Sequence, residues 1–397
     1  MRPSLADFSD QVIFLTGLHF FLGCASMDAA PLRGSRSGPT DRGIEMNDVR
    51  TDVVVVGAGP TGLTLACELA RRGKAVRILD QREAPHRESR GKGLRPGSLE
   101  VFEGLGIADE LRALGSTDRI YRKYFDGEHA ADTHVEGLML IGQWQIEEAL
   151  RARLADLGVR VEYGAQVHGI AQHADGVTAS LGDGRSVRAA YLAGCDGGRS
   201  AVRKLLGIAF EGHTDDEQAM VVGDVRAPGL SRAHWHQWFT SDGHAMMLCP
   251  IPGTDTFQLQ ASPERDARGR ALPPTLEGFQ RLFDRHARMP GIRLTDPTWM
   301  STWRVNVRMA DRLREGRAFL AGDAAHVHPI AGGFGMNTGI GDAAALARSL
   351  SGEVPLDAYE AERLPVAAHV LADTSARMRR VEEAVRTPGR GIEAALD

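Results

Sequence analysis

The sequence predicts an α/β fold in which a doubly wound sheet is interrupted by a smaller antiparallel sheet and followed by a long C-terminal helix. Residues 52–56 form a buried β-branched run, as expected of a parallel strand, and lead through a glycine-rich turn into a helical pattern. The order strand, turn and helix recurs at residues 189–200 and 317–350. Between these two segments, residues 210–303 carry alternating, aromatic-rich runs separated by turn residues, a pattern typical of antiparallel strands.

The composition is that of a globular protein with several domains. The chain has 397 residues, of which 43% are hydrophobic and 25% charged, and this length suggests two or three domains. It has 47 basic and 52 acidic residues without a long basic run, so nothing indicates a nucleic-acid surface. The cysteines lie far apart and form no C-x-x-C pair, which argues against a disulfide scaffold and predicts a cytoplasmic protein; they are Cys24, Cys67, Cys195 and Cys249.

Residues 1–50 are predicted to lie outside the folded domains. Residues 11–25 are apolar but shorter than the roughly 20 residues that a membrane-spanning helix needs, so no membrane span is expected. A signal peptide is the alternative, but the preceding residues include two aspartates where a signal would be basic. We favour a disordered extension or an upstream start-site artefact, with Met46 as a natural start of the folded protein.

Residues 51–80 contain a dinucleotide-binding pattern. The motif G-x-G-x-x-G comprises Gly57, which permits a tight turn, Gly59, which lets the backbone approach a pyrophosphate, and Gly62, which allows close helix–strand packing. The helix that follows, to residue 72, offers unpaired N–H groups to phosphates at its N-terminus. A second strand, residues 75–79, ends at Asp80, which is placed to accept a hydrogen bond from a ribose hydroxyl.

The rest of the chain divides into predicted domains. The doubly wound domain comprises residues 51–209 and 304–350, the inserted sheet residues 210–303, and the C-terminal helical segment residues 351–397. We predict helices at residues 96–114 and 143–157, a hairpin turn at Asp183-Gly184, and a helix at residues 276–287 inside the inserted sheet. Residues 115–142 are expected to form a short connection.

Three turns follow predicted parallel strands: residues 57–62, Asp196-Gly197 and Gly322-Asp323. Ligands of such sheets bind at the carboxyl ends of the strands, so all three turns can face one extended cofactor. Residues 332–337 would offer a helix N-terminus to an electron-rich ring. Asp196 has an alternative role, because an aspartate here can simply cap the helix that begins near Ser200.

These segments resemble the single-component, class A FAD-dependent aromatic monooxygenases, the group around p-hydroxybenzoate hydroxylase, and most closely its branch of phenol, polyketide and rifampicin-type hydroxylases. The matching text is VVVVGAGPTGLTLACELARRG, CDGGRSAVRKLLGI and GRAFLAGDAAHVHPIAGGFGMNTGIGDAAALA, and the resemblance covers about residues 50–385. It implies a Rossmann-like, GR2-type FAD-binding domain with an inserted antiparallel-sheet substrate domain and a C-terminal helix.

The resemblance also implies which residues contact FAD. Asp323 would bind the ribityl chain, Asp196 would serve both FAD and NAD(P)H, and the backbone N–H groups of Met336 and Asn337 would hold the pyrimidine edge of the flavin. Arg90 is preferred over its neighbours Arg87 and Arg95. The implied cofactor residues are Gly57, Gly59, Pro60, Thr61, Gly62, Asp80, Gln81, Arg90, Gln143, Asp196, Gly197, Gly322, Asp323, Pro329, Gly335, Met336 and Asn337.

The implied activity is hydroxylation of a small phenolic or polyketide-like aromatic substrate. NADPH or NADH would reduce FAD, O2 would form a flavin C4a-hydroperoxide, and this species would transfer a hydroxyl group to the ring. The resemblance further implies a homodimer. The alternatives are an FAD-dependent reductase or dehydrogenase without oxygen insertion, and a non-catalytic flavin-binding protein.

Substrate contacts are expected from the aromatic-rich run at residues 234–239. Alternation places His234, His236 and Trp238 on one face of the strand and the remaining residues of the run on the other, and one face should pack as core. Either set can face the flavin; we take His234, His236 and Trp238, with Pro329, as the substrate candidates. The sequence names no catalytic base. The spacing of Asp323, His326 and His328 matches no recognised zinc pattern, so no metal is expected.

Overall fold

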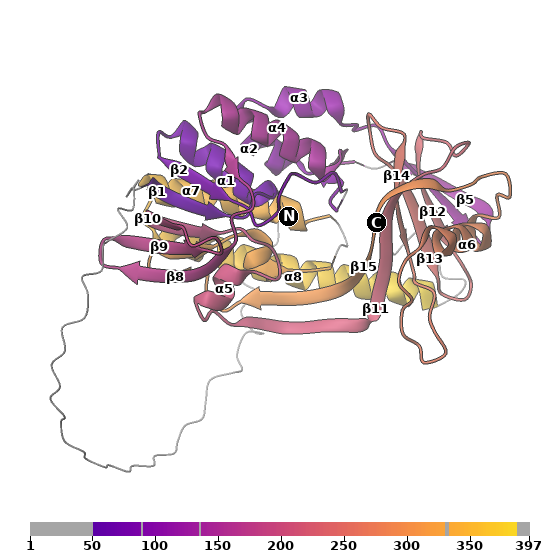
Figure 1. Ribbon diagram of the computed structural model, residues 1–397. Coiled ribbons are helices and arrows are strands. Elements are labelled where there is room, and N and C mark those ends of the chain that lie inside the picture. The colour runs from indigo at the N-terminus through magenta and orange to yellow at the C-terminus, as the bar shows by residue number, and fades with distance from the viewer. Residues whose placement is uncertain (1–50, 89, 135, 330–332, 387–397) are drawn as a thin grey trace, which may run out of the picture. The chain divides into compact units, whose positions relative to one another are not determined.

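Two eight-stranded sheets and one two-stranded sheet organise the residues that the computed structural model describes, which are 51–88, 90–134, 136–329 and 333–386 (Figure 1). The expected extension at residues 1–50 lies outside the described residues, as does Gly332, the first residue of the predicted ring-binding segment. No helix in the described ranges is long and apolar enough to cross a membrane.

The first sheet is the predicted doubly wound sheet. Its central strand β1 (Thr51–Val56) pairs in parallel with β2 (Val76–Leu79) and β10 (Ser186–Gly194), and β10 pairs in parallel with β17 (Ala318–Leu320). The strand order is β16-β17-β10-β1-β2-β7, with β16 at Arg314–Glu315 and β7 at Val161–Glu162. The strands β8 (Val167–His173) and β9 (Gly176–Leu181) extend the sheet from β10, and the β9–β10 hairpin turns at the predicted Asp183-Gly184.

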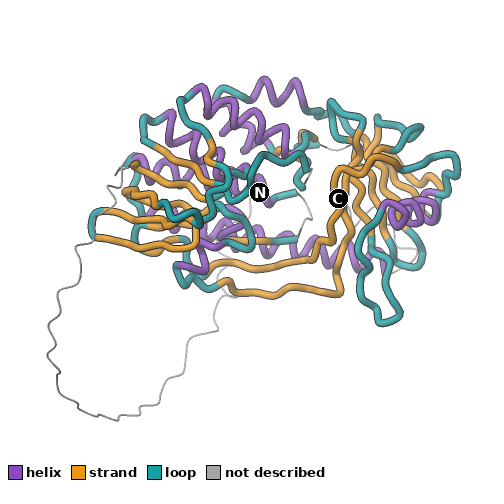
Figure 2. The backbone as a smooth tube through the Cα atoms, viewed as in Figure 1, coloured by secondary structure: helices purple, strands orange, loops and turns teal. Residues whose placement is uncertain are grey.

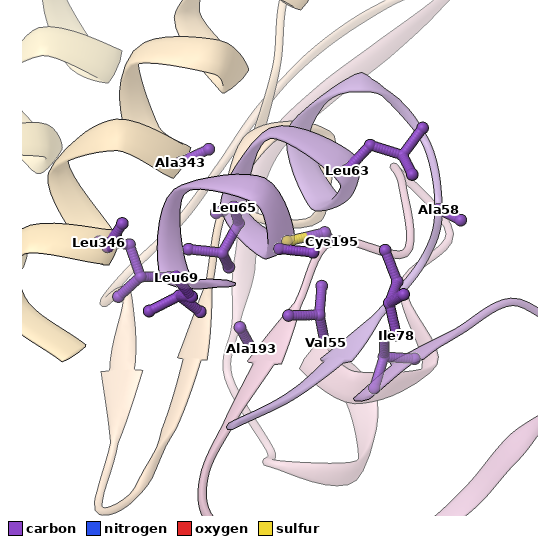
Figure 3. Packing of buried hydrophobic residues seen from close by; sticks show 14 of the residues in the cluster. Val55, Ala58, Leu63, Leu65, Leu69, Ile78, Ala193, Cys195, Ala343 and Leu346 are labelled. Carbon is purple, nitrogen blue, oxygen red and sulfur yellow. The ribbon is translucent and has the colours of Figure 1, made fainter. Parts of the chain in front are cut away.

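Helices cover this sheet with apolar side chains. Leu65 and Leu69 of α1 (Pro60–Arg71) are buried in one cluster with strand residues such as Val55 and Ala193, and with Leu346 of α7 (Gly335–Ser351) (Figure 3). The cluster also includes buried residues of α4 (Gln143–Asp156) and of α8 (Asp357–Arg386), the expected C-terminal helix. Burial of these side chains, each worth about 1.5–3 kcal/mol, makes the sheet a rigid platform for the turns at its edge.

The predicted helix at residues 96–114 is two helices, α2 (Pro96–Leu105) and α3 (Ala108–Leu114). Gly106 ends α2 in the left-handed region, with φ of 76°. A glycine adopts this conformation at little cost, so the chain stops the first helix there and starts a second two residues later.

The second sheet has the order β18-β15-β11-β14-β13-β12-β4-β5. Figure 2 shows its long strands β11 (Phe210–Arg226) and β15 (Thr295–Ala310) side by side, in agreement with their antiparallel register. The strands β12 (His234–Phe239), β13 (Ala245–Pro250) and β14 (Thr256–Ala261) complete the predicted antiparallel part, and β18 (His326–Val327) adds a short edge. The helix α6 (Leu276–Ala287) lies where it was predicted.

Residues 115–142 are more than the connection expected from the sequence. They supply β4 (Ile120–Phe125) and β5 (Glu128–His134) to the second sheet, where β4 pairs in parallel with β12. The second sheet is therefore mixed, and β15 carries it beyond the predicted boundary at residue 303 to Ala310. A separate two-stranded sheet joins β3 (Gly93–Leu94) to β6 (Met139–Leu140).

Candidate functional site

The structure brings the three predicted turns to one edge of the first sheet. Val56 aligns with Gly194 in the β1–β10 register, and Gly194 aligns with Leu320 in the β10–β17 register. The turns that follow these residues therefore emerge side by side at the carboxyl ends of the strands, where ligands of doubly wound sheets bind.

Glycines let the three turns touch one another. Gly57 has φ of 103°, and a Cβ there would lie 2.3 Å from the carbonyl oxygen of Cys195 and 2.9 Å from the Cα atom of Asp196, where the second turn begins. Gly322 has φ of 63°, and a Cβ there would lie 2.5 Å from the Thr61 Oγ1 atom, in the first turn. A Cβ on Gly62 would lie 1.9 Å from the Gly57 carbonyl oxygen. Any larger side chain at these positions would push the turns apart.

The N-terminus of α1 fits a phosphate group. Gly59 is the residue before the helix, no side chain caps the helix, and its first turn contains no acidic residue. Pro60 starts the helix without losing a hydrogen bond, because the first N–H group of a helix has no partner within it. A Cβ on Gly59 would meet no atom within 4 Å, so the backbone there is open to close approach by a ligand.

Asp80 is in place at the end of β2, and its carboxylate is occupied by protein donors. The Ala58 N–H donates to Oδ2 (2.8 Å), the Arg82 N–H donates to Oδ1 (2.9 Å), and the Arg82 guanidinium donates to both oxygens. Burial favours a raised pKa, but the hydrogen bonds from Arg82 and Ala58 outweigh it and lower the pKa of Asp80. These four contacts account for the accepting positions of a carboxylate. A ribose hydroxyl that binds Asp80 must therefore replace a contact with Arg82.

Asp323 presents a carboxyl group to solvent from the short helix η1 (Gly322–Ala324). Although the side chain is exposed, the surrounding protein desolvates the carboxyl group and raises its pKa, while His326, His328 and Arg90 lower it. Arg90, which is itself exposed and paired with Glu88, is thus close enough to act on Asp323. Gln81 is also exposed.

A buried ion cluster that the sequence did not reveal supports the Gly322-Asp323 turn. Asp342 of α7 accepts hydrogen bonds from the His326 Nε2 atom (2.6 Å), the Arg363 Nε atom (2.8 Å) and the Gly322 N–H (3.0 Å). Burial opposes ionisation of Asp342, but His326 and Arg363 outweigh it and hold its pKa low. The Tyr359 hydroxyl also donates to the Leu320 carbonyl (2.7 Å), so α7 and α8 both fix this turn.

Asp196 has the capping role that was the alternative reading of its position. It accepts hydrogen bonds from the Ser200 hydroxyl (2.5 Å) and from the N–H groups of Ala201 (2.7 Å) and Val202 (3.1 Å), at the start of α5 (Ala201–Leu205). Gly197 follows with φ of 78°. Sequence reasoning missed Arg203, whose guanidinium donates to the Gly198 carbonyl (3.0 Å) and the Ala324 carbonyl (2.8 Å) and so ties the second turn to the third.

Asn337 joins the start of α7 to the loop before α2. Its side-chain oxygen accepts from the Arg95 N–H (2.9 Å) and the Ser98 hydroxyl (2.7 Å), and its amide nitrogen donates to the Gly93 carbonyl (3.0 Å). The Asn337 side chain thus holds the loop before α2 in place. This role was not predicted from the sequence, which assigned only the backbone N–H of Asn337, as a flavin contact.

Gly91, in the same loop, lies between the expected ring contacts. Its carbonyl accepts from the Gln143 N–H (2.9 Å), and a Cβ on Gly91 would lie 3.6 Å from the Met336 sulfur. Gly335 begins α7, and the buried Pro329 accepts a hydrogen bond from the His328 Nδ1 atom (3.0 Å).

The two faces of β12 have different surroundings, and the face expected to contact substrate is the one under α6. Trp238 is fully buried, stacks on Tyr124 and packs edge-on against Phe283 of α6. His236 is bonded to the Tyr124 hydroxyl (3.0 Å) and the Ser231 carbonyl (2.8 Å), and His234 to the Ser231 hydroxyl (3.0 Å). Of the predicted substrate contacts, His236 and Trp238 are thus buried on the α6 side of the sheet, and His234 is half-buried at the start of the strand.

The opposite face of β12, which we call the polar face, carries aromatic and amide side chains and contacts β6 and the loop before β3. Trp235 packs with Leu140 of β6 and Cys249 of β13. Three buried side-chain atoms on this face have no hydrogen-bond partner among the described residues: Trp235 Nε1, Gln237 Oε1 and Gln258 Nε2. Trp238 Nε1 and the two ring nitrogens of His286 also lack partners among the described residues, but the core under α6 encloses them, so the opposite face is the candidate binding surface.

No group of three or more potential metal-ligating side chains occurs in the described part of the chain. His326 and His328 use ring nitrogens for the contacts to Asp342 and Pro329, respectively.

Comparisons with known proteins identify the family. A family model described as FAD binding domain matches residues 50–374. A flavin-dependent monooxygenase of Mycobacteroides abscessus is 41% identical over 348 residues, which are 80% of this chain and 72% of the relative. A rifampicin monooxygenase of Streptomyces venezuelae is 37% identical over 341 residues, 83% of this chain and 71% of the relative.

The solved structures agree with the sequence relatives. The ternary complex of aklavinone-11 hydroxylase with FAD and aklavinone superposes with a TM-score of 0.74 at 31% identity, and covers 88% of this chain and 71% of that one. The uncapped helix N-terminus, the exposed Asp323 and the loop around Gly91 also suit a flavin dinucleotide. The chain therefore belongs to the FAD-binding-domain family of flavin-dependent aromatic monooxygenases.

Proposed function

We propose that the protein hydroxylates a phenolic or polyketide-like aromatic compound with O2, using NADPH or NADH as the electron donor. The observation that carries the proposal is the polar face of the second sheet, where Trp235, Gln237 and Gln258 bury polar atoms without partners among the described residues. An aromatic compound with oxygen substituents offers both the flat ring and the polar groups that such a face requires.

Each turn of the first sheet then has a task. Gly59 and the first turn of α1 would hold the pyrophosphate, Asp80 a ribose hydroxyl, and Asp323 the ribityl chain. The loop at Gly91, with Gln143, Pro329 and the start of α7, would hold the ring. FAD, when bound, supplies the oxygen chemistry, with electrons from the nicotinamide. The chain must orient the substrate ring and keep water away from the reaction, and α6 supports the latter by sealing the far face of the sheet.

Asp196 is proposed to act on the cofactor through α5 rather than by direct contact alone. Both of its oxygens accept hydrogen bonds at the start of α5, and Arg203 links this turn to Asp323 through the Ala324 carbonyl. An NAD(P)H molecule that approaches Asp196 would thus meet a turn whose geometry is already fixed.

We also propose a cytoplasmic location and a homodimer. The described cysteines Cys67, Cys195 and Cys249 are free and buried, as is usual for a protein kept in a reducing compartment. Sedimentation equilibrium of the FAD-loaded protein tests the dimer, and a single species with the mass of one chain would contradict it.

The decisive experiment follows NADPH oxidation by FAD-loaded protein against a panel of phenols and hydroxylated polyketides. O2 uptake and peroxide are measured together, and products formed under 18O2 are examined by mass spectrometry. We expect substrate-stimulated oxidation with one 18O atom in the product and little peroxide. Turnover without 18O incorporation would support a reductase or dehydrogenase instead, and FAD binding without any oxidation would support a non-catalytic flavoprotein.

A further inference from the structure

Lys92 extends from the first domain towards the polar face of the second sheet. It follows Gly91 and precedes β3, in the loop that Asn337 ties to the start of α7 through the Gly93 carbonyl. Its ammonium group donates a hydrogen bond to the Gln258 Oε1 atom of β14 and lies 4.9 Å from the ring centre of Trp235 in β12. The side chain thus runs from the residues expected to hold the flavin ring to the residues expected to hold the substrate.

Two buried hydrogen-bond donors belong to the residues that Lys92 contacts and have no acceptor among the described residues. Because an ammonium group can only donate, the oxygen of the Gln258 amide must face Lys92, and its nitrogen points elsewhere. That nitrogen and the Trp235 Nε1 atom are both donors, both are buried, and neither has a partner in the described part of the chain. Lys92 itself has three donor positions and makes one hydrogen bond to the described residues.

The charges nearby favour an anion. Burial raises the pKa of the Cys249 thiol, and the Asp224 carboxylate raises it further. Three cations close to the thiol oppose this rise: Lys92, Arg119 and Arg232. The Arg119 guanidinium donates a hydrogen bond to the Arg232 carbonyl. The Arg232 guanidinium in turn donates to the carbonyls of Ile251 and Thr256. Desolvation lowers the pKa of Lys92, although Cys249 and Asp224 oppose this effect. An anionic ligand oxygen would relieve the desolvation of the ammonium group.

We propose that Lys92, with the Gln258 amide nitrogen and the Trp235 indole nitrogen, forms a subsite that binds an ionised oxygen of the substrate, a phenolate or enolate on the aromatic framework. The subsite selects acidic phenols and enols over their ethers. It rests on the proposed function, which makes this face the substrate surface, but it concerns binding and needs no turnover. Lys92 is a substrate-positioning residue in this arrangement.

The test uses alizarin, a hydroxyanthraquinone whose visible spectrum reports whether its 2-hydroxyl group is ionised, and alizarin 2-methyl ether, which cannot ionise there. Both are titrated into FAD-loaded protein without NADPH. We expect the wild-type protein to bind the alizarin anion at least about tenfold more tightly than the ether, and the ligand's apparent pKa to fall by about one unit on binding. In Lys92→Met the preference disappears, and in Lys92→Arg most of it remains.

Matched variants separate ligand binding from a structural tie between the two domains. Lys204→Met removes an exposed lysine on α5 and should leave both affinities unchanged. Gln258→Leu removes the proposed amide donor and should weaken the anion preference even if Lys92→Met fails to fold. FAD content and melting temperature are recorded for every variant.

Two results would overturn the subsite. One is an equal change in the affinities for alizarin and its ether on Lys92→Met, which would make Lys92 a purely structural tie. The other is a wild-type protein without preference for the anion, including one that binds neither compound. Absence of hydroxylation with an intact anion preference would instead refute only the proposed function.

Discussion

Gly339 offers a direct test of how the first and third turns fit together. It lies within α7, and an alanine methyl group there would sit 2.3 Å from the Thr61 Oγ1 atom and 3.3 Å from the Gly322 Cα atom. Overpacking of this kind costs about 1–3 kcal/mol, whereas alanine in place of glycine inside a helix gains about 1 kcal/mol. We therefore expect Gly339→Ala to lower the free energy of unfolding by up to about 2 kcal/mol.

Thr61→Ala should relieve most of this penalty. It removes the Oγ1 atom and leaves a Cβ atom at 3.6 Å, an ordinary van der Waals distance. In the Thr61→Ala background, Gly339→Ala should be neutral or slightly stabilising, so the coupling between the two substitutions should reach about 1–3 kcal/mol.

The assay is urea unfolding of the four proteins of the double-mutant cycle, followed by circular dichroism, with FAD affinity measured by flavin fluorescence. Gly97→Ala in the first turn of α2 is the matched control, because a Cβ there meets no atom within 4 Å. Equal destabilisation by Gly339→Ala in both backgrounds would refute the proposed contact between Thr61 and Gly339 as its cause.

Three further substitutions test the buried polar groups. Asp342→Ala leaves His326 and Arg363 without their carboxylate and should cost about 3–5 kcal/mol in urea unfolding; a loss under 1 kcal/mol would contradict a supporting role for the cluster. Arg203→Met should weaken FAD binding about tenfold or more in a fluorescence titration while leaving the α6 core intact, and unchanged affinity would count against the link between the turns. Burial lowers the pKa of His286 to about 4, so its neutral form favours folding and stability falls as pH drops from about 6.5 towards 4, by about 2–3 kcal/mol. His286→Leu should flatten this pH dependence in thermal melts, and an unchanged slope would show that other groups cause it.

The cofactor edge could be predicted from the sequence because its signals are local. Gly57, Asp196 and Gly322 each follow a short buried strand, and parallel pairing of those strands suffices to bring the turns together. The supporting contacts could not be predicted. Asp342 and Arg203 act through residues 20 and 121 positions away, and ordinary helix patterns give no sign of such partners.

The second sheet was predicted less completely, for two reasons. The β4–β5 hairpin carries a recognisable signal, Asp126-Gly127 between alternating runs, with both residues at positive φ. The sequence favours a connection here because residues 115–142 lie between two predicted helices, at residues 96–114 and 143–157. Which face of β12 packs as core depends on where α6 lies, and the strand's own alternation is the same for either choice.

The parallel pairing of β4 with β12 bears on how this enzyme can be re-engineered. Residues 210–303 lie in the sequence between the two segments that form the first sheet. They therefore suggest a unit that could be exchanged between relatives to transfer substrate preference. An exchange with those limits would pair the donor's β12 with the recipient's β4 and would divide β15 between the two proteins, so side chains that face each other in this sheet would come from different sources. A working chimaera has to take residues 116–140 and the whole of β15 from the same donor. The recombined sheet then keeps the pairing of β11 with β15, and Trp235 keeps its contact with Leu140.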